Sequence, residues 1–207
     1  MNYTKRILFG LLSIFFAGLL TTSVWAKNND VAAAQNRVLQ VTQSIAKKLG
    51  ENKAQYNKNP ALLHALIRNE VLPFIDFDAM SKLTLGKHWR KASSAQRQRF
   101  VNAYREMLIK SYGKTMLKYA GATIRGGNSV ANKKPGYVIV RTIVTPKGSA
   151  SITANYDVRK KSGDWKAYNV QVGGINLITN FRTNFTREVS AKGLDALITR
   201  LEKSNHK

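Results

Sequence analysis

Two helices and the turn between them are predicted by residues 72–119, LPFIDFDAMSKLTLGKHWRKASSAQRQRFVNAYREMLIKSYGKTMLKY. Ser93 and Gln96 have the spacing of a capping box, in which two side chains satisfy free backbone N–H groups at a helix start. Large side chains then recur every three or four residues, which places them on one helical face: Phe100, Tyr104, Leu108, Tyr112, Met116 and Tyr119. This long helix with one wide apolar face decides the fold.

The opposite face of the same helix is basic, and its members are Arg97, Arg99, Arg105, Lys110, Lys114 and Lys118. Spacing alone favours an amphipathic helix that covers a hydrophobic core. The second interpretation is that the wide aromatic and Met side chains line a cavity for an apolar ligand. The helix by itself leaves both interpretations open.

The N-terminus has the layout of a secretory signal peptide. Lys5 and Arg6 form a positive start, and the apolar run of residues 7–20 is short for a membrane span. Ala26 stands at a typical cleavage position. We therefore expect a signal peptide over residues 1–26 and a single exported domain over 27–207, with an uncleaved anchor as the alternative.

The chain is strongly basic, with 34 Lys and Arg against 11 Asp and Glu and a formal charge of +23. Such an excess suggests nucleic acid or an anionic surface as partner, and the export signal argues against nucleic acid. Lipid headgroups, lipopolysaccharide and acidic protein faces remain, beside the alternative that the charge serves solubility. The absence of cysteine excludes disulfides and thiolate chemistry.

The remaining periodicities predict helices first, then strands, then helices. A stripe over residues 31–49 predicts a helix with Gly50 as its C-terminal cap. Asn59 and Asp76 are predicted N-terminal caps. Strands are expected at 122–125, 137–145, 149–160 and 165–173, with Tyr168, Val170 and Val172 on one face, and helices follow them. The predicted class is α+β, with helices packed on one face of a curved antiparallel sheet.

Catalytic and metal-binding patterns are weak. The histidines after the predicted cleavage site, His64, His88 and His206, lack metal-ligand spacing, so we expect no metal site. An enzyme would need a carboxylate with a raised pKa inside a cavity, and Asp76 or Asp157 are the candidates. Capping explains Asp76 better, and we therefore expect no catalytic residue.

Several motifs resemble the MlaC (toluene-tolerance) family of periplasmic phospholipid-binding proteins. The resemblance covers nearly all of the chain after residue 26, in order. The motifs are Leu72-Pro73-x-x-Asp76-Phe77-x-x-Met80, Leu85-Gly86-x-x-Trp89-Arg90-x-Ala92-Ser93-x-x-Gln96-Arg97-x-x-Phe100, Trp165-Lys166-x-Tyr168, Asn180-Phe181-Arg182-x-x-Phe185 and Gly193-Leu194-x-x-Leu197-Ile198.

The resemblance implies a fold like that of nuclear transport factor 2, with a lipid cavity between helices and sheet. It implies a monomeric carrier whose only bound ligand is phospholipid. It also implies shuttling between an outer-membrane lipoprotein–porin complex and an inner-membrane ABC transporter complex with its MCE-domain subunit, which maintains outer-membrane lipid asymmetry. The alternatives are an enzyme of the same fold acting on a small apolar substrate, and a basic envelope adaptor without ligand.

Two sets of site residues follow. The expected cavity wall consists of Leu72, Phe77, Met80, Trp89, Phe100, Tyr104, Leu108, Tyr112, Met116, Val140, Ile152, Tyr156, Tyr168, Val170, Val172, Ile178, Phe181 and Phe185. The expected docking surface is the basic side of the long helix at Arg97, Arg99, Lys110, Lys114 and Lys118.

Overall fold

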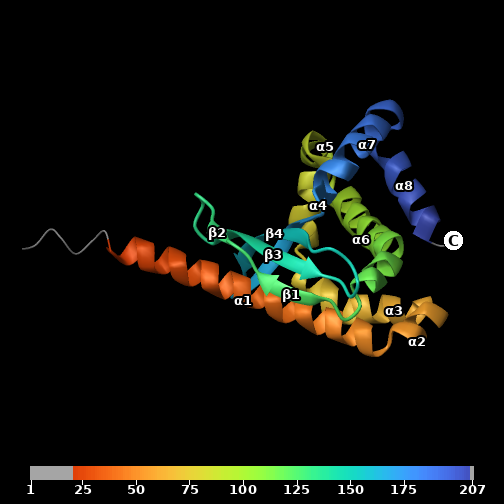
Figure 1. Ribbon diagram of the computed structural model, residues 1–207. Coiled ribbons are helices and arrows are strands. Elements are labelled where there is room, and N and C mark those ends of the chain that lie inside the picture. The colour runs from red at the N-terminus through yellow and green to blue at the C-terminus, as the bar shows by residue number, and fades with distance from the viewer. Residues whose placement is uncertain (1–20, 206–207) are drawn as a thin grey trace, which may run out of the picture.

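The computed structural model describes residues 21–205 of the chain, and their side chains from residue 29 onward (Figure 1). Most of the predicted signal peptide, residues 1–20, lies outside the described residues. The helices are α1 (Thr21–Glu51), α2 (Lys53–Lys58), α3 (Pro60–Leu66), a π-helical turn η1 (Ile67–Val71), a 3₁₀ turn η2 (Leu72–Phe74), α4 (Phe77–Leu85), α5 (Lys87–Lys91), α6 (Ser94–Met116), a 3₁₀ turn η3 (Leu117–Tyr119), α7 (Leu177–Lys192) and α8 (Leu194–Asn205). Within the described part of the chain, none of these helices combines the length and apolarity needed to cross a membrane.

The strands form one antiparallel sheet in the order β1-β3-β4-β5-β6, with β2 beside β3. Their bounds are β1 (Thr123–Gly126), β2 (Val130–Ala131), β3 (Tyr137–Thr145), β4 (Ile152–Lys161), β5 (Asp164–Val172) and β6 (Ile175–Asn176). Ser162 and Gly163 both have positive φ and join β4 to β5, as a two-residue hairpin turn requires. The predicted class, α+β with helices packed on one face of a curved antiparallel sheet, is confirmed.

Two of the three apolar clusters among the described residues hold most of the helices in place. The first lies between α1 and the inner face of the sheet, where Val38 and Leu49 pack with Val138, Val158 and Ala167. The second is a helical cluster of α4, α6, α7 and α8, and Figure 1 shows these helices gathered beside one end of the sheet. The long helix α6 contributes residues to both clusters. This position of α6 determines where the candidate site lies.

The predicted N-terminal caps are present. Asn59 accepts a hydrogen bond from the backbone of α3, and Asp76 from that of α4. Ser93 and Gln96 form the complete capping box of α6. Gly50, however, does not end α1, which continues to Glu51. Its lack of a side chain instead lets α1 approach the backbone of Gly121, whose N–H donates to a carbonyl of α1 at 2.7 Å.

A β-bulge changes the faces of β5. Val158 pairs with Ala167 and Asp157 with Asn169, so Tyr168 is the extra residue between them. The alternation of β5 side chains between the two faces of the sheet therefore shifts by one residue at Tyr168. The prediction that Tyr168 shares a face with Val170 is wrong, because the ring of Tyr168 packs on Tyr137 at the outer side of the sheet instead.

Candidate functional site

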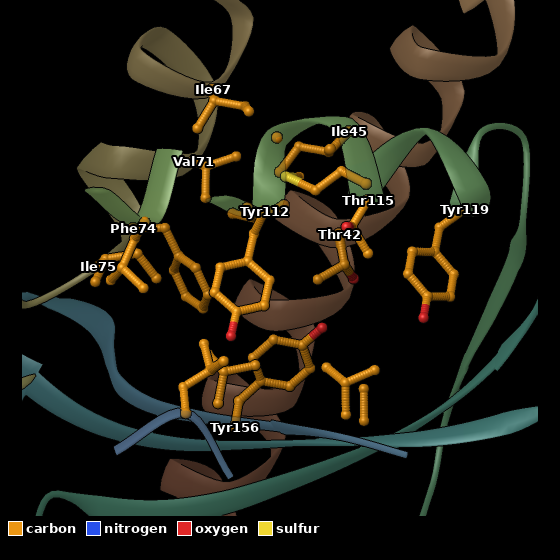
Figure 2. A pocket seen from close by; sticks show the side chains of 18 of the residues that line it. Thr42, Ile45, Ile67, Val71, Phe74, Ile75, Tyr112, Thr115, Tyr119 and Tyr156 are labelled. Atoms are coloured by element: carbon orange, nitrogen blue, oxygen red, sulfur yellow. The ribbon is translucent and has the colours of Figure 1, made fainter. Parts of the chain in front are cut away.

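A cavity of about 400 Å³ lies between the helices and the inner face of the sheet, a size typical of small-molecule sites. Figure 2 shows its interior, with Tyr112 pointing from the helical side toward the sheet and Tyr156 rising from the sheet below it. Tyr119 lies toward one end of the same space. The wall is built from α1, η1, η2, α4, α6, η3 and strands of the sheet.

The helical wall follows the periodicity of α6. Leu108, Tyr112 and Met116 are four residues apart and line the cavity together, as neighbours on one helical face do. The floor comes from β4 and β5, where Ala154 pairs with Val172 and Tyr156 with Val170. The bulge at Tyr168 turns these valines inward, so the inner face of β5 stays apolar on both sides of the bulge.

Apart from Arg105, the polar side chains of the wall are neutral, and two of them, Thr42 and Tyr156, have local hydrogen-bond partners. The Thr42 hydroxyl donates to the carbonyl of Val38, one helical turn earlier, at 2.7 Å. Burial raises the pKa of Tyr156 to about 12, against the lowering influence of a hydrogen bond with Thr142. Tyr156 is therefore uncharged at neutral pH. A wall of this kind suits an apolar ligand and offers little for a small polar one.

The structure brings ten of the eighteen predicted wall residues together around this cavity: Leu72, Phe77, Met80, Leu108, Tyr112, Met116, Ile152, Tyr156, Val170 and Val172. They lie on five separate elements from η2 to β5, and the fold brings their side chains to one space. Whether they contact lipid stays a prediction.

The other eight predicted wall residues lie elsewhere. Five of them, together with Trp89, pack in the helical cluster: Phe100, Tyr104, Ile178, Phe181 and Phe185. Val140 is fully buried in the core between α1 and the sheet. Tyr168 is at the bulge on the outer face. Neighbouring elements pack against Val140 and the residues of the helical cluster, whereas Tyr168 lies on the face of the sheet that is turned away from the cavity.

Sequence reasoning missed the part of the wall that α1 and the turns after α3 supply. These residues are Val41, Thr42, Ile45, Ala46, Leu49, Ile67, Val71, Phe74 and Ile75. The stripe over residues 31–49 identified an apolar face on α1. Nothing in that stripe separates the residues that face a hollow from those that face the core.

The two carboxylates considered as catalytic bases are not among the described residues that line the cavity. Asp76 is buried, caps α4 and binds Arg159 and Lys161 of β4. Burial alone would raise the pKa of Asp76, but the hydrogen bonds from Lys161 and Arg159 lower it overall. Asp157 accepts a hydrogen bond from Asn169 on the outer face of the sheet. Among the described residues, no group of His, Cys, Asp or Glu could hold a metal ion.

The predicted docking residues have different surroundings. Arg97 donates to backbone carbonyls of α5. Arg99 pairs with two carboxylates of α8, and Lys110 donates to a carbonyl at the end of α8. Lys114 and Lys118 are exposed and form no ion pair with any described residue. Three of the five cations therefore bind the protein's own helices, and two remain available on the surface.

Comparisons with known proteins agree along most of the chain. A family model described as MlaC protein matches residues 39–203. The intermembrane phospholipid transport system binding protein MlaC of Haemophilus influenzae is 23% identical over 197 residues, which cover 94% of this chain and 90% of that protein. The toluene tolerance protein ttg2D of Pseudomonas putida is 30% identical over 189 residues, which cover 90% and 84% of the two chains.

A solved structure has the same fold. The phospholipid-binding protein of Ralstonia solanacearum, in complex with a phospholipid, superposes with a TM-score of 0.75 at 21% identity. The superposition covers 84% of this chain and 97% of that chain.

Proposed function

Because the chain belongs to the MlaC family, we propose that it is a periplasmic phospholipid carrier. The observation that supports the proposal most directly is the apolar cavity between α6 and the sheet. Relatives of this chain are a binding protein of an intermembrane phospholipid transport system and a phospholipid-binding protein in complex with its lipid. The carrier holds acyl chains in the cavity and moves lipid between outer- and inner-membrane complexes, in support of outer-membrane lipid asymmetry.

Transfer by such a carrier requires docking. Burying one methylene is worth roughly 0.8 kcal/mol, so two acyl chains with about 30 methylenes favour the cavity over water by on the order of 20 kcal/mol. Release into water is then negligible. The lipid must pass directly to a partner, for which we propose an outer-membrane lipoprotein–porin complex and an inner-membrane ABC transporter complex with its MCE-domain subunit.

The carrier needs no catalytic residue and no cofactor besides the lipid, since transfer only relocates an intact molecule. The signal peptide over residues 1–26 delivers the domain over 27–207 to the periplasm. Edman sequencing of the protein from a periplasmic extract is expected to begin at Lys27, and a retained Met1 in cells would contradict this part of the proposal.

Native mass spectrometry of the purified protein tests the lipid-binding proposal. We expect a bound mass equal to a phospholipid, which organic extraction removes. In Val170→Glu a carboxylate enters the apolar wall, where burial of a charge is costly, so the bound fraction should fall to a minor species while the circular dichroism spectrum stays unchanged.

Gln171→Glu is the matched control, because neighbouring residues of a strand point to opposite faces and Gln171 points away from the cavity. It should keep the lipid load of the wild type. A wild-type protein that never binds lipid would contradict the carrier proposal. A folded Val170→Glu variant with an undiminished load would contradict the assignment of Val170 to the lipid-binding wall.

A further inference from the structure

Arg105 is the one charged side chain among the described residues that line the cavity. Its sequence neighbourhood suggests the basic outer face of the helix, but it lies three residues before Leu108 and seven before Tyr112. These spacings put all three on one side of a helix. The reason for the difference is α8, which covers the side of α6 that carries Arg99 and Lys110 and leaves the side with Arg105 toward the cavity.

The guanidinium of Arg105 has donors without partners. Its Nη2 donates to Asn102 at 3.2 Å, whereas its Nε is shielded from solvent and has no hydrogen-bond partner. The nearest carboxylate, that of Glu106, is 3.9 Å from Nε, beyond hydrogen-bond distance, and is bound by Arg68 at 2.5 Å. An arginine offers five N–H donors, and an unpaired buried donor destabilises the protein.

Arg105 also marks an opening of the cavity. Its side chain is 36% exposed, so a ligand group bound there keeps contact with water. From Arg105, the apolar face of α6 runs through Tyr112 to Met116, a distance of about 16 Å at the helical rise per residue. The wall is therefore amphipathic along its length, with a cation at one end and aromatic and aliphatic side chains beyond it.

We propose that Arg105 binds the phosphate of the phospholipid at the mouth of the cavity, with the acyl chains lying along α6 toward Met116. This inference rests on the proposed lipid-carrier function and adds the residue that orients the lipid. The planar guanidinium matches two phosphate oxygens at once, which makes its hydrogen bonds strong and directional. The arrangement selects amphiphiles with a phosphate over neutral ones of equal chain length.

The test is a competition on delipidated protein. Wild type, Arg105→Gln and Arg105→Lys are exposed to vesicles that contain phosphatidylglycerol and diacylglycerol of identical chains, and native mass spectrometry gives the ratio of the two bound lipids. We expect the wild type to prefer phosphatidylglycerol, Arg105→Gln to lose about tenfold of that preference, as for one charge-assisted hydrogen bond, and Arg105→Lys to retain part of it.

Arg99→Gln removes the same charge from the side of α6 that faces α8 and should keep the wild-type ratio. An Arg105→Gln variant that folds and keeps the wild-type ratio overturns the role of Arg105 while the carrier function stands. A wild type that binds neither lipid overturns both. If Arg105→Gln does not fold, the ratio measured for Arg105→Lys decides: a preference below that of the wild type supports the proposal, and an equal one overturns it.

A titration with inorganic phosphate distinguishes a site for the phosphate of a lipid headgroup from a site for free phosphate. Titrated into the delipidated protein and followed by phosphorus NMR, free phosphate should bind at most weakly, because the acyl chains supply most of the affinity. Tight binding of phosphate that Arg105→Gln abolishes would show a site for the free anion and overturn the assignment to a lipid headgroup.

Discussion

Tyr104 and Tyr112 stand two turns apart on α6, and their surroundings differ completely. Tyr104 is fully buried, with Phe100 stacked on it at 5.4 Å and the rings of Phe181 and Phe185 edge-on at 5.6 and 5.8 Å. Tyr112 touches Phe181 only at its edge, at 6.3 Å, and otherwise borders the cavity. The same residue type on the same helix thus belongs to a packed cluster in one place and to a hollow in the other.

The partner across the helix explains this difference. Opposite the N-terminal half of α6, α7 contributes two phenylalanines that interlock with its rings. Opposite the C-terminal half, the floor of the sheet contributes Ala154, Val170 and Val172. These short side chains leave space open between the sheet and α6, and Tyr156 of β4 rises into that space. The size of the opposing side chains, rather than the amphipathic stripe itself, separates core from cavity.

The strongest test of this comparison is a pair of truncations on α6. Phe100→Ala removes a ring from a closed cluster and should lower the free energy of unfolding by about 3–5 kcal/mol. Met116→Ala borders the hollow, where contacts on one side are already missing, and should cost at most about 1 kcal/mol. Urea unfolding of delipidated proteins measures both, and equal losses would show that the two regions are packed alike.

Much of the architecture could be predicted from local patterns. The caps at Asn59, Asp76 and Ser93 follow from residue type and spacing, and β3 has the predicted bounds. The family motifs, spread over nearly the whole domain, gave the MlaC assignment, which the family match confirms. These features depend on neighbours in sequence.

The misplaced residues depend on partners far away in sequence. The face of Tyr168 is set by a bulge that appears only when β4 and β5 pair. The packing of Phe181 is set by the rings of α6. No local periodicity contains this information for Tyr168 or Phe181. For Arg105 it does, because its spacing from Leu108 and Tyr112 places all three on one side of the helix, and α8 packs on the other side.

An ion pair joins the start of α4 to the sheet. Its removal should have the next largest effect on the free energy of unfolding. Asp76 opens α4 on the helical side, and its carboxylate binds Arg159 and Lys161 of the sheet. Asp76→Asn keeps a good helix cap but removes the charge, so two cations lose their buried partner. Because both cations are partly exposed, we expect a loss of roughly 2 kcal/mol at neutral pH, which is below the range for a fully buried pair.

This contribution should depend on pH in a defined way. The pKa of Asp76 is lower in the folded protein than in the unfolded chain. Its stabilisation is therefore fully present above the unfolded pKa of about 4 and is lost as the pH falls through the folded pKa. The difference in unfolding free energy between wild type and Asp76→Asn should be equal at pH 7 and pH 5 and smaller at pH 3. A difference that grows on acidification would contradict this account.

Beside the cavity, the backbones of Gly50 and Gly121 are in close contact. A substitution at Gly50 tests this contact, and we expect a smaller change in the free energy of unfolding. Alanine normally stabilises a helix interior by 0.5–1 kcal/mol over glycine. A Cβ at Gly50, however, would lie 2.9 Å from backbone atoms of Gly121. Gly50→Ala should therefore destabilise the protein by about 1–2 kcal/mol.

Gly113→Ala is the comparison for this change, because the nearest atoms there belong to the side chains of Ile67 and His64, at 3.2 and 3.3 Å. Side chains can move more easily than backbone, so the cost should be clearly smaller. Thermal unfolding of both variants gives the order, and a stabilised Gly50→Ala protein would show that α1 can shift away from Gly121.

The smallest effect concerns the outer surface of the hollow half of α6. Lys114 and Lys118 are exposed on it and pair with no described carboxylate, so they can attract an anionic partner while Arg99 is held by α8. Charge steering acts on the association rate and is screened over about 8–10 Å at physiological salt. Reversing both lysines to glutamate should slow lipid transfer between donor and acceptor membranes a few-fold at low salt and leave the lipid load unchanged.

The control is Lys87→Glu with Lys91→Glu on α5, which makes the same change of net charge with the same spacing at another place. Equal slowing by both double variants would mean that only net charge matters, and no slowing by either would assign docking to apolar contacts around the mouth.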